Sequence, residues 1–292
     1  MQILDIVSAQ AFAANVGVGT AGGASSFKAF AKGHLATKKI LKEGTSDFED
    51  YRHGLLLESE RLFFLGVSFY WRAFDQLMAS SSPLALISLY YSSFFSAKSL
   101  LGIFGLWLDS PNLGIEPLTL RPGNISLAVR NRKHLGQLVN IGSTGQFQGP
   151  HRQFWKLYYE SVGQIIPWVD PKISHVLRPY SGMNETWQID SRNEINYDGY
   201  HALKLCKDFQ ENFDPRGISK DSLPGMLGPH LFAARDTLKI TANFFVENKI
   251  SPNSLDALGR PNQNRASKIR QLVFQASRRN FNREPMARGL AV

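Results

Sequence analysis

The pattern of apolar and polar residues predicts a chain that is mainly helical over residues 51–249. Apolar residues recur at helical spacing through 55–78, and a second apolar segment at 84–108 follows directly after the helix-breaking SSSP stretch. A link this short predicts that the two long helices pack as an antiparallel hairpin. Further helices are expected at 151–166, through 192–213 and at 229–249.

One stretch departs from the helical period. Residues 118–130, LTLRPGNISLAVR, alternate apolar and polar positions, and Pro122-Gly123 lies between the two halves, as a type II turn prefers. The sequence therefore predicts a small β-hairpin, within residues 117–130, inserted into a helical protein.

Three segments are predicted along the chain. They are an N-terminal helical extension at 1–50, a helical bundle at 51–250 that carries the hairpin, and a basic C-terminal segment at 251–292. Within the first segment a helix is expected at 27–42. A G-x-G-x-x-G match at 17–22 follows an Ala-rich stretch instead of the strand that dinucleotide binding needs, so a flexible turn is favoured there.

The segment 84–108 is long enough to cross a membrane, but its pattern favours a buried bundle helix. Lys98 lies in its middle, and serines form a stripe at helical spacing, namely Ser88, Ser92, Ser96 and Ser99. The N-terminus lacks the basic start of a secretory signal. The single cysteine, Cys206, excludes an intrachain disulfide and a cysteine-based metal site. We therefore expect a cytoplasmic protein with no membrane contact, no cofactor and no metal.

The charge of the chain points to an anionic partner. The net charge is +9, and the isoelectric point of about 9.6 is typical of proteins that meet nucleic acid or an anionic surface. Between Arg260 and Arg288 eight basic residues accompany one acid, Glu284. This stretch is either a solvated tail or a nucleic-acid contact, and the basic run 130–134 is either a solvated loop or a second contact. The residues predicted to bind RNA are Arg130, Arg132, Lys133, Arg265, Lys268, Arg270, Arg278 and Arg279.

The stretch SRNEINYDGYH at 191–201 is too polar to be plain core. Ser191 and Glu194 have the spacing of a capping box, which predicts a helix beginning at Arg192; the alternative is a start near Asn184. Either start places Arg192 near a helix N-terminus, where anions are favoured, and a guanidinium suits two-pronged phosphate binding.

The helical period then decides which side chains accompany Arg192. Asn196 is one turn on and shares its face, and Tyr197 lies beside that face. His201 would lie on the opposite side of an unbroken helix. The stretch is either a structural polar network, with Arg192 paired to a buried acid, or a site for an anion.

Two segments resemble the motifs of the HEPN proteins, a superfamily of nucleotide-binding helical bundles. Residues 89–101, LYYSSFFSAKSLL, resemble the aromatic helix of that family, and 192–200, RNEINYDGY, resemble the later helix that begins with arginine. The resemblance covers about 51–249. It implies a bundle of four or five helices that commonly dimerises, with the arginine site near the dimer cleft.

Many HEPN proteins are metal-independent endoribonucleases of toxin–antitoxin and anti-phage systems, in which a histidine follows the arginine by four to six residues. Here Tyr197 occupies that position, and a phenol is a weak general base at neutral pH. The resemblance thus implies Arg192, Asn196 and Tyr197 as the candidate catalytic group.

The expected function is that of an RNA-associated protein of a prokaryotic defence or toxin–antitoxin type system, with weak or absent nuclease activity. Two alternatives stay open: an active metal-independent endoribonuclease, and a non-catalytic dimeric scaffold for a protein partner encoded nearby. RNA or other nucleic acid and a second copy of the chain are the expected partners. His151 and His230, each at the start of a helix, are expected to be ordinary polar residues.

Overall fold

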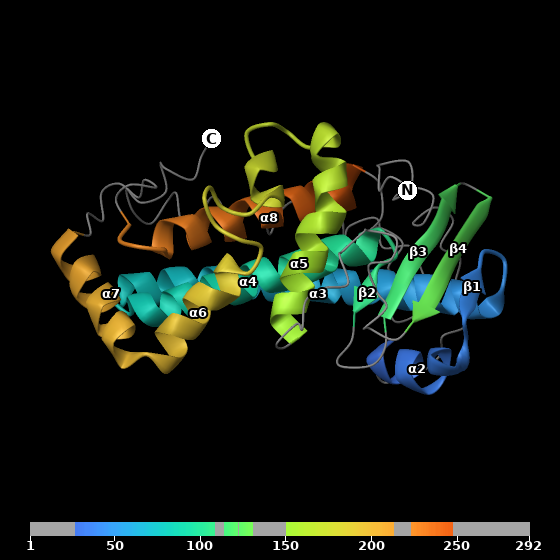
Figure 1. Cartoon of the computed structure of the whole chain (residues 1–292), viewed down its shortest axis with the longest axis horizontal. Helices are drawn as coiled ribbons and strands as arrows, with labels where there is room; N and C mark the ends of the chain where they lie inside the picture. Colours follow the sequence, from blue (N-terminus) through green and yellow to red (C-terminus); the bar gives the residue numbers. More distant parts are fainter. Residues whose placement is uncertain (1–26, 109–113, 122, 131–149, 213–222, 248–292) are drawn as a thin grey trace.

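Two long antiparallel helices form the axis of the protein. The computed structural model describes residues 27–108, 114–121, 123–130, 150–212 and 223–247. Helices α3 (Ser46–Met78) and α4 (Ser82–Ile103) lie along the longest dimension of the molecule, and α8 (Leu227–Glu247) packs against both (Figure 1). The mainly helical fold and the α3–α4 hairpin predicted from the sequence are confirmed.

The ends of the two long helices differ from the prediction. Helix α3 begins at Ser46, well before residue 55, because the side chain of Thr45 caps it by accepting from the backbone N–H of Phe48. Helix α4 ends at Ile103 and does not continue to residue 108. Gly105 has a φ of 78°, which glycine adopts readily and which ends the helix, and Trp107–Leu108 form the short strand β2.

The α3–α4 contact is made by small residues and by hydroxyl groups. Gly66 of α3 lies against Ser92 and Ser96 of α4, and the Oγ of Ser92 donates to the carbonyl of Gly66 at 2.8 Å. Near the other end, Ser99 Oγ donates to the carbonyl of Ser59 at 2.6 Å. The predicted serine stripe is therefore the face of α4 that meets α3.

Helix α4 is a core helix. Among the described helices it alone is long and apolar enough, by length and composition, to cross a membrane, and 67% of its most apolar window is buried within the protein. A backbone carbonyl of α4 also binds α8, since the hydroxyl of Thr241 donates to the carbonyl of Ser96 at 3.3 Å. The expectation of a buried bundle helix is confirmed.

A four-stranded antiparallel sheet covers one end of the α3–α4 hairpin. Its order is β1-β4-β3-β2. The strands are β1 (Ile40–Lys42), β2 (Trp107–Leu108), β3 (Gly114–Arg121) and β4 (Asn124–Arg130). The predicted hairpin is β3 and β4, which meet at the pair Arg121↔Asn124 beside Gly123, whose φ is 74°.

The helix predicted at 27–42 begins at Phe27 as expected, but its second half is wrong. Helix α2 (Phe27–Gly33) is short, a 3₁₀ turn η1 (Leu35–Thr37) follows it, and Ile40–Lys42 form β1. Strand β1 pairs with β4, with Ile40 opposite Ala128, so a partner far along the chain overrides the local helical pattern. The glycine stretch at 17–22 and the basic segment 251–292 lie outside the described residues.

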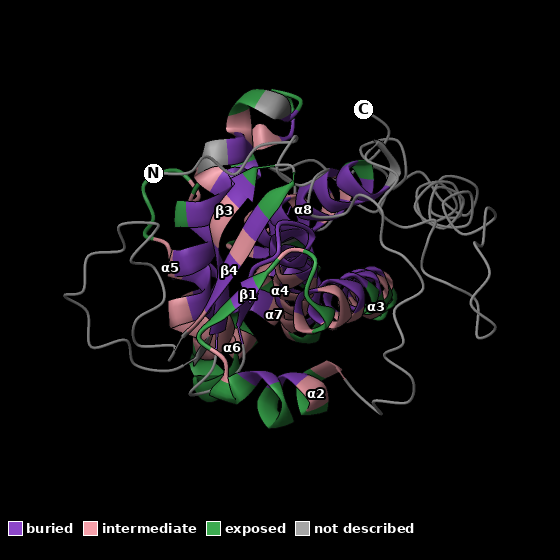
Figure 2. Ribbon diagram, turned by 90° about the vertical axis from the view of Figure 1, so that its right-hand side faces the viewer, coloured by how far each residue is buried: buried purple, intermediate pink, exposed green. Residues whose placement is uncertain are grey.

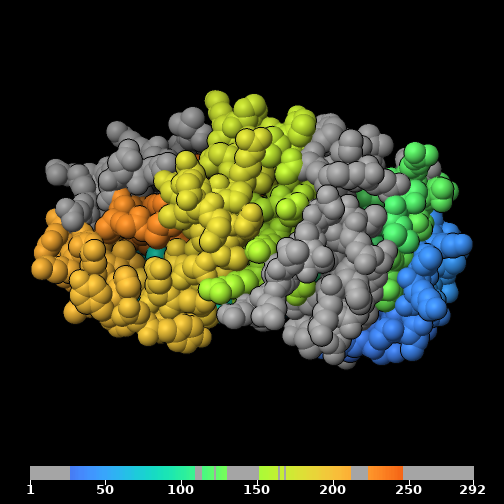
Figure 3. All heavy atoms as spheres, in the orientation of Figure 1, coloured from blue at the N-terminus to red at the C-terminus, as the bar shows by residue number. Residues whose placement is uncertain are grey.

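The remaining helices cover the middle and the far end of the hairpin. They are α5 (Pro150–Val162), the 3₁₀ helices η3 (Gly163–Trp168) and η4 (Ser174–Leu177), α6 (Trp187–Tyr197) and α7 (Gly199–Asn212). In the space-filling view these segments form the central surface, and little of α4 can be seen (Figure 3). Buried residues are concentrated on α4, α8 and the sheet, whereas α2 exposes most of its surface (Figure 2).

Helix α6 neither begins nor ends as predicted. It begins at Trp187, so Ser191 lies inside the helix, where its Oγ donates to the carbonyl of Trp187 at 2.8 Å. The predicted capping box is therefore wrong, and the alternative start near Asn184 is closer. At Asp198 the backbone is extended and the helix breaks. A carboxylate oxygen of Asp198 accepts from the backbone N–H of Tyr200 at 2.9 Å, which caps α7.

The core contains one histidine without a polar partner. His230 of α8 has no exposed surface, and its ring packs against Trp187 with 4.8 Å between the ring centroids. Neither ring nitrogen has a hydrogen-bond partner in the described part of the chain. Burial lowers the pKa of His230 to about 3, because a charged imidazole would lose its hydration there.

The close approach of α3 and α4 predicts that a methyl group at position 66 destabilises the protein. A Cβ on Gly66 would lie 2.4 Å from Ser96 Oγ and 3.2 Å from the Ser92 carbonyl. We expect Gly66→Ala to lower the stability by about 1–3 kcal/mol, although alanine is the better helix former. Gly163→Ala, with nothing within 4 Å of its Cβ, is the control and should be neutral or stabilising. Equal melting temperatures for the two variants would contradict the close packing.

The buried His230 predicts a loss of stability in mild acid. Its folded-state pKa is lowered from 6.5 to about 3, so the unfolded chain binds the proton more readily. The contribution of His230 to the free energy of unfolding is therefore complete above about pH 6.5. It declines as the pH falls toward 3, with a slope of at most ~1.4 kcal/mol per pH unit. Chemical denaturation of His230→Phe between pH 7.5 and 4 should show a shallower decline than the unmodified protein. If the free energy of unfolding declines equally with pH in both proteins, His230 does not take up a proton on unfolding.

Candidate nucleic-acid interface

Arg192 connects α6 to α4. It lies in the second turn of α6, is half-buried, and its Nη2 donates to the hydroxyl of Tyr91 at 2.9 Å. Its Nη1 donates to the Asn193 side chain at 3.0 Å. The Arg192 Cζ atom also lies 5.7 Å from the centroid of the Tyr91 ring, within the range of a cation–π contact.

The described part of the chain gives Arg192 no acid that compensates its charge. None of the ion pairs in the described part of the chain includes it, and the nearby carboxylate of Asp190 pairs with Arg152 at 2.6 Å. Burial acts to lower the pKa of Arg192, but the hydroxyls of Tyr91 and Tyr197 act to raise it, and the net shift of the pKa is upward. The guanidinium therefore keeps its charge, and the buried acid of the structural alternative is not present among the described residues.

Asn196 and Tyr197 stand beside the guanidinium. In the amide orientation that satisfies both groups, the Asn196 oxygen accepts from Arg192 Nη2 at 3.0 Å. The Tyr197 ring centroid lies 6.0 Å from Arg192 Cζ, and Tyr197 is 80% exposed. The structure thus brings together the three residues of the candidate catalytic group, whose chemical role remains a prediction.

His201 belongs to a different helix. The break at Asp198 places it in the first turn of α7, where its Nδ1 lies 2.7 Å from Asp198 Oδ2. Because the helix is broken, the angular estimate for an unbroken helix does not apply to it. His201 is exposed and makes its hydrogen bond to the cap of α7.

Three aromatic rings lie next to one another between Arg192 and α3. Phe69 of α3 lies 5.4 Å from Tyr91 and 5.5 Å from Phe95 of α4, measured between ring centroids, and all three residues are half-buried. The guanidinium carbon of Arg72 lies 5.3 Å from the Phe69 ring centroid. Phe69, Arg72, Tyr91, Phe95 and Arg192 together form what we call the aromatic–cationic strip.

A histidine that was expected to be an ordinary polar residue lies next to the strip. His151, in the first turn of α5, stacks on Phe94 with 4.5 Å between ring centroids, and its Nδ1 lies 2.6 Å from the Tyr90 hydroxyl. Burial raises the pKa of Tyr90, so this hydroxyl stays protonated. Lys98 extends the pattern, since its Nζ lies 5.5 Å from the Phe94 ring centroid.

Four residues of this region were not predicted to belong to a site: Phe69 and Arg72, Phe95 of the aromatic motif, and His151, which was expected to be an ordinary polar residue. The available signal was the density of aromatic residues in two segments, 69–74 (FYWRAF) and 89–95 (LYYSSFF). Periodicity showed that both segments are helical. Only the pairing of α3 with α4 shows that their rings share one surface.

Of the residues predicted to bind RNA, Arg130 lies in the described part of the chain. Arg130 is the last residue of β4. The other predicted RNA-binding residues lie outside the described part of the chain, namely Arg132, Lys133, Arg265, Lys268, Arg270, Arg278 and Arg279. Within the described residues, no group of three or more His, Cys, Asp or Glu side chains could hold a metal ion.

Comparison of the chain with models of known protein families, with curated proteins and with solved structures gives no match. The resemblance to HEPN proteins therefore rests on the two sequence motifs, and membership in that superfamily stays a prediction.

Proposed function

We propose that the protein binds single-stranded RNA through the aromatic–cationic strip and cleaves it weakly or not at all. The observation that carries this proposal is Arg192, a charged guanidinium that no described carboxylate neutralises and that lies beside half-exposed aromatic rings. Together with the resemblance to HEPN proteins, it supports a role in a prokaryotic defence or toxin–antitoxin type system in the cytoplasm.

The geometry suits a single strand because it offers both interactions that such a ligand needs. A guanidinium has five N–H donors, and four neighbouring side chains accept from Arg192, namely Tyr91, Asn193, Asn196 and Tyr197, so one donor remains for a phosphate oxygen. Half-buried rings such as Phe69 and Phe95 provide faces on which bases stack, at about 1–3 kcal/mol per base. The net charge of +9 favours any polyanion at long range.

Weak cleavage follows from the shortage of a free general base. Attack by a ribose 2′-hydroxyl needs a group that removes its proton. Tyr197 occupies the position expected for that group, and a phenol is a poor base at neutral pH. His201, whose Nδ1 lies 2.7 Å from Asp198 Oδ2, belongs to α7, and the described residues show no contact between it and Arg192.

A second candidate function is an active metal-independent endoribonuclease. One observation favours it: His151 stacks on Phe94, adjacent to the strip, and could supply the imidazole that α6 lacks. Its Nδ1 lies 2.6 Å from the Tyr90 hydroxyl, so the ring is held next to the strip. The third possibility, a scaffold for a protein partner encoded nearby, would use the same half-buried rings for protein contact.

The RNA proposal predicts that Arg192→Gln weakens binding far more than it weakens the fold. Affinity for a labelled single-stranded RNA, measured by fluorescence anisotropy, should fall at least ~10-fold, equivalent to about 1.4 kcal/mol. Loss of the bond to Tyr91 costs only about 1 kcal/mol of stability, or about 2–4 °C in melting temperature. Arg61→Gln removes the same charge from an exposed site on α3 and should leave affinity nearly unchanged.

Three further results would separate the alternatives in the same experiment. Deletion of 251–292 should flatten the salt dependence of binding if the basic segment also contacts RNA. The RNA should remain intact in EDTA; cleavage that His151→Ala abolishes would establish the second function instead. Equal affinity of Arg192→Gln and Arg61→Gln would contradict the proposed strip.

The resemblance also leads us to propose a homodimer that uses a half-buried ring of α4. Leu89 and Tyr90 are buried within the chain, and Tyr91 and Phe95 belong to the strip, so the ring available for such a contact is Phe94. Light scattering at micromolar concentration should give about twice 32.7 kDa. Phe94→Glu should give the monomer mass, because a carboxylate would be buried at the contact. A monomer before substitution would contradict the dimer.

A further inference from the structure

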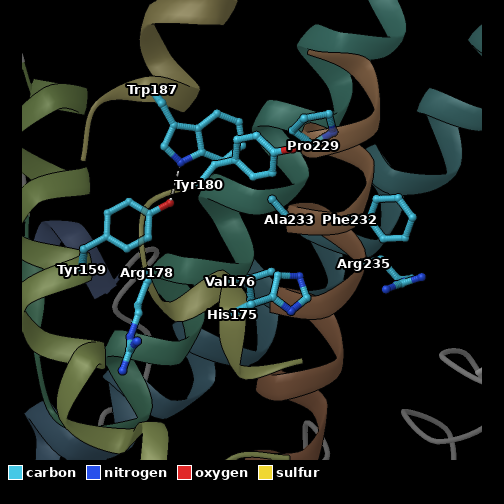
Figure 4. A pocket seen from close by; sticks show the side chains of 10 residues that line it. All are labelled: Tyr159, His175, Val176, Arg178, Tyr180, Trp187, Pro229, Phe232, Ala233 and Arg235. Carbon is cyan, nitrogen blue, oxygen red and sulfur yellow. Dashed lines mark hydrogen bonds between the residues drawn. The ribbon is translucent and has the colours of Figure 1, made fainter. Parts of the chain in front are cut away.

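A cavity of about 390 Å³ opens between η4, α6 and α8 (Figure 4). It lies on a different side of α6 from the strip, since Trp187 and Arg192 are five residues apart, or about 140° around a helix. Tyr159, Tyr180, Trp187 and Phe232 contribute rings to its wall, and His175 and Arg178 contribute polar groups. Its size and its mainly apolar lining are those of a site for a small molecule.

The aromatic wall is held in place from behind. Trp187 Nε1 and Gln188 Nε2 both donate to the Tyr159 hydroxyl at 3.1 Å. The Trp187 ring lies 5.9 Å from Tyr180 and, behind it, 4.8 Å from His230, measured between centroids. Burial raises the pKa of Tyr159 to about 12, so the wall carries no negative charge at neutral pH. A planar ligand would meet rings that are already positioned.

The basic side chains at the cavity differ in whether a nearby carboxylate compensates their charge. Arg235 donates twice to the buried carboxylate of Asp236, at 2.6 and 2.8 Å, so its charge is compensated. His175 Nε2 lies 3.5 Å from the same carboxylate. Arg178 is exposed and has no acidic partner among the residues that the structure describes. One uncompensated cation at an aromatic cavity matches a ligand with one negative charge.

We propose that this cavity binds a small planar aromatic monoanion, with its carboxylate at Arg178 and its ring beside Tyr159, Tyr180 and Trp187 (Figure 4). A guanidinium binds a carboxylate through two parallel N–H groups, and offset ring contacts favour an aromatic ligand over an aliphatic one of equal size. The proposal does not depend on RNA binding, because no residue of the strip lines the cavity.

The test uses the full chain and a pair of probes that differ only in charge. Indole-3-acetate should give saturation-transfer signals on its ring protons and measurable heat in calorimetry. Indole-3-acetamide, which has the same ring without the charge, should bind at least ~10-fold more weakly. Arg178→Gln should remove this preference for the acid, and because Arg178 is exposed the variant should melt like the unmodified protein.

Two control variants test whether the probe binds in the cavity or is attracted by the positive charge of the whole protein. Arg121→Gln, at an exposed position on the sheet, should bind indole-3-acetate normally. Ala233→Met, which places a larger side chain in the cavity wall, should weaken both probes. Equal binding of acid and amide, or full binding by either Arg178→Gln or Ala233→Met, would overturn the proposal. Adenosine monophosphate is the third probe, and if it alone binds, the anion recognised is a phosphate ester and the proposed carboxylate is wrong.

Discussion

The rest of the structure depends on how closely α3 approaches α4. Gly66 and Gly102 leave room for serine side chains of the opposite helix, since a Cβ on Gly102 would lie 2.0 Å from Ser59 Oγ. Hydroxyl groups then donate to backbone carbonyls across the contact, as Ser92 and Ser99 do. Buried polar groups stabilise a contact only when they are paired, and here the pairing holds the two helices in one register. A longer side chain at either glycine would separate them.

This register determines where the aromatic–cationic strip can exist. Phe69 belongs to α3, whereas Tyr91 and Phe95 belong to α4, so their rings meet only when the two helices are aligned as they are. Arg192 joins the same surface because α6 packs on α4 and its guanidinium reaches Tyr91. A surface built on three packed helices is rigid, which favours stacking of bases without a large ordering cost.

Arginines that are paired with a carboxylate stabilise the fold, whereas arginines without such a partner are available to a ligand. Arg235 is committed to the buried Asp236, and Arg152 is paired with Asp190. Arg192 and Arg178 have no such carboxylate within the described residues, and both lie beside aromatic rings. Helix α6 contributes Arg192 to the strip and Trp187 to the cavity, so a change in the position of this helix would affect both sites.

Periodicity along the chain was sufficient to predict the long elements. Helices α3, α4 and α8 have sustained apolar patterns, and β3 and β4 alternate around Pro122-Gly123, so local sequence and fold agree there. Asn196 was likewise placed beside Arg192 correctly, because one helical turn separates them in any register. The ends of helices were less predictable, since Gly105 and Asp198 act through backbone conformation and capping and do not change the hydrophobic pattern.

Only the tertiary structure decided the features that join distant segments. Strand β1 has three residues, too few to show a period, and it is a strand because β4 offers it a partner. The strip required α3 and α4 to bring Phe69 and Phe95 together, and the cavity required η4, α6 and α8 to leave a space. The sequence by itself determined which segments are helical and which are basic, because these properties are local. Which of those basic groups stay uncompensated depends on neighbours far along the chain, and packing alone selects them.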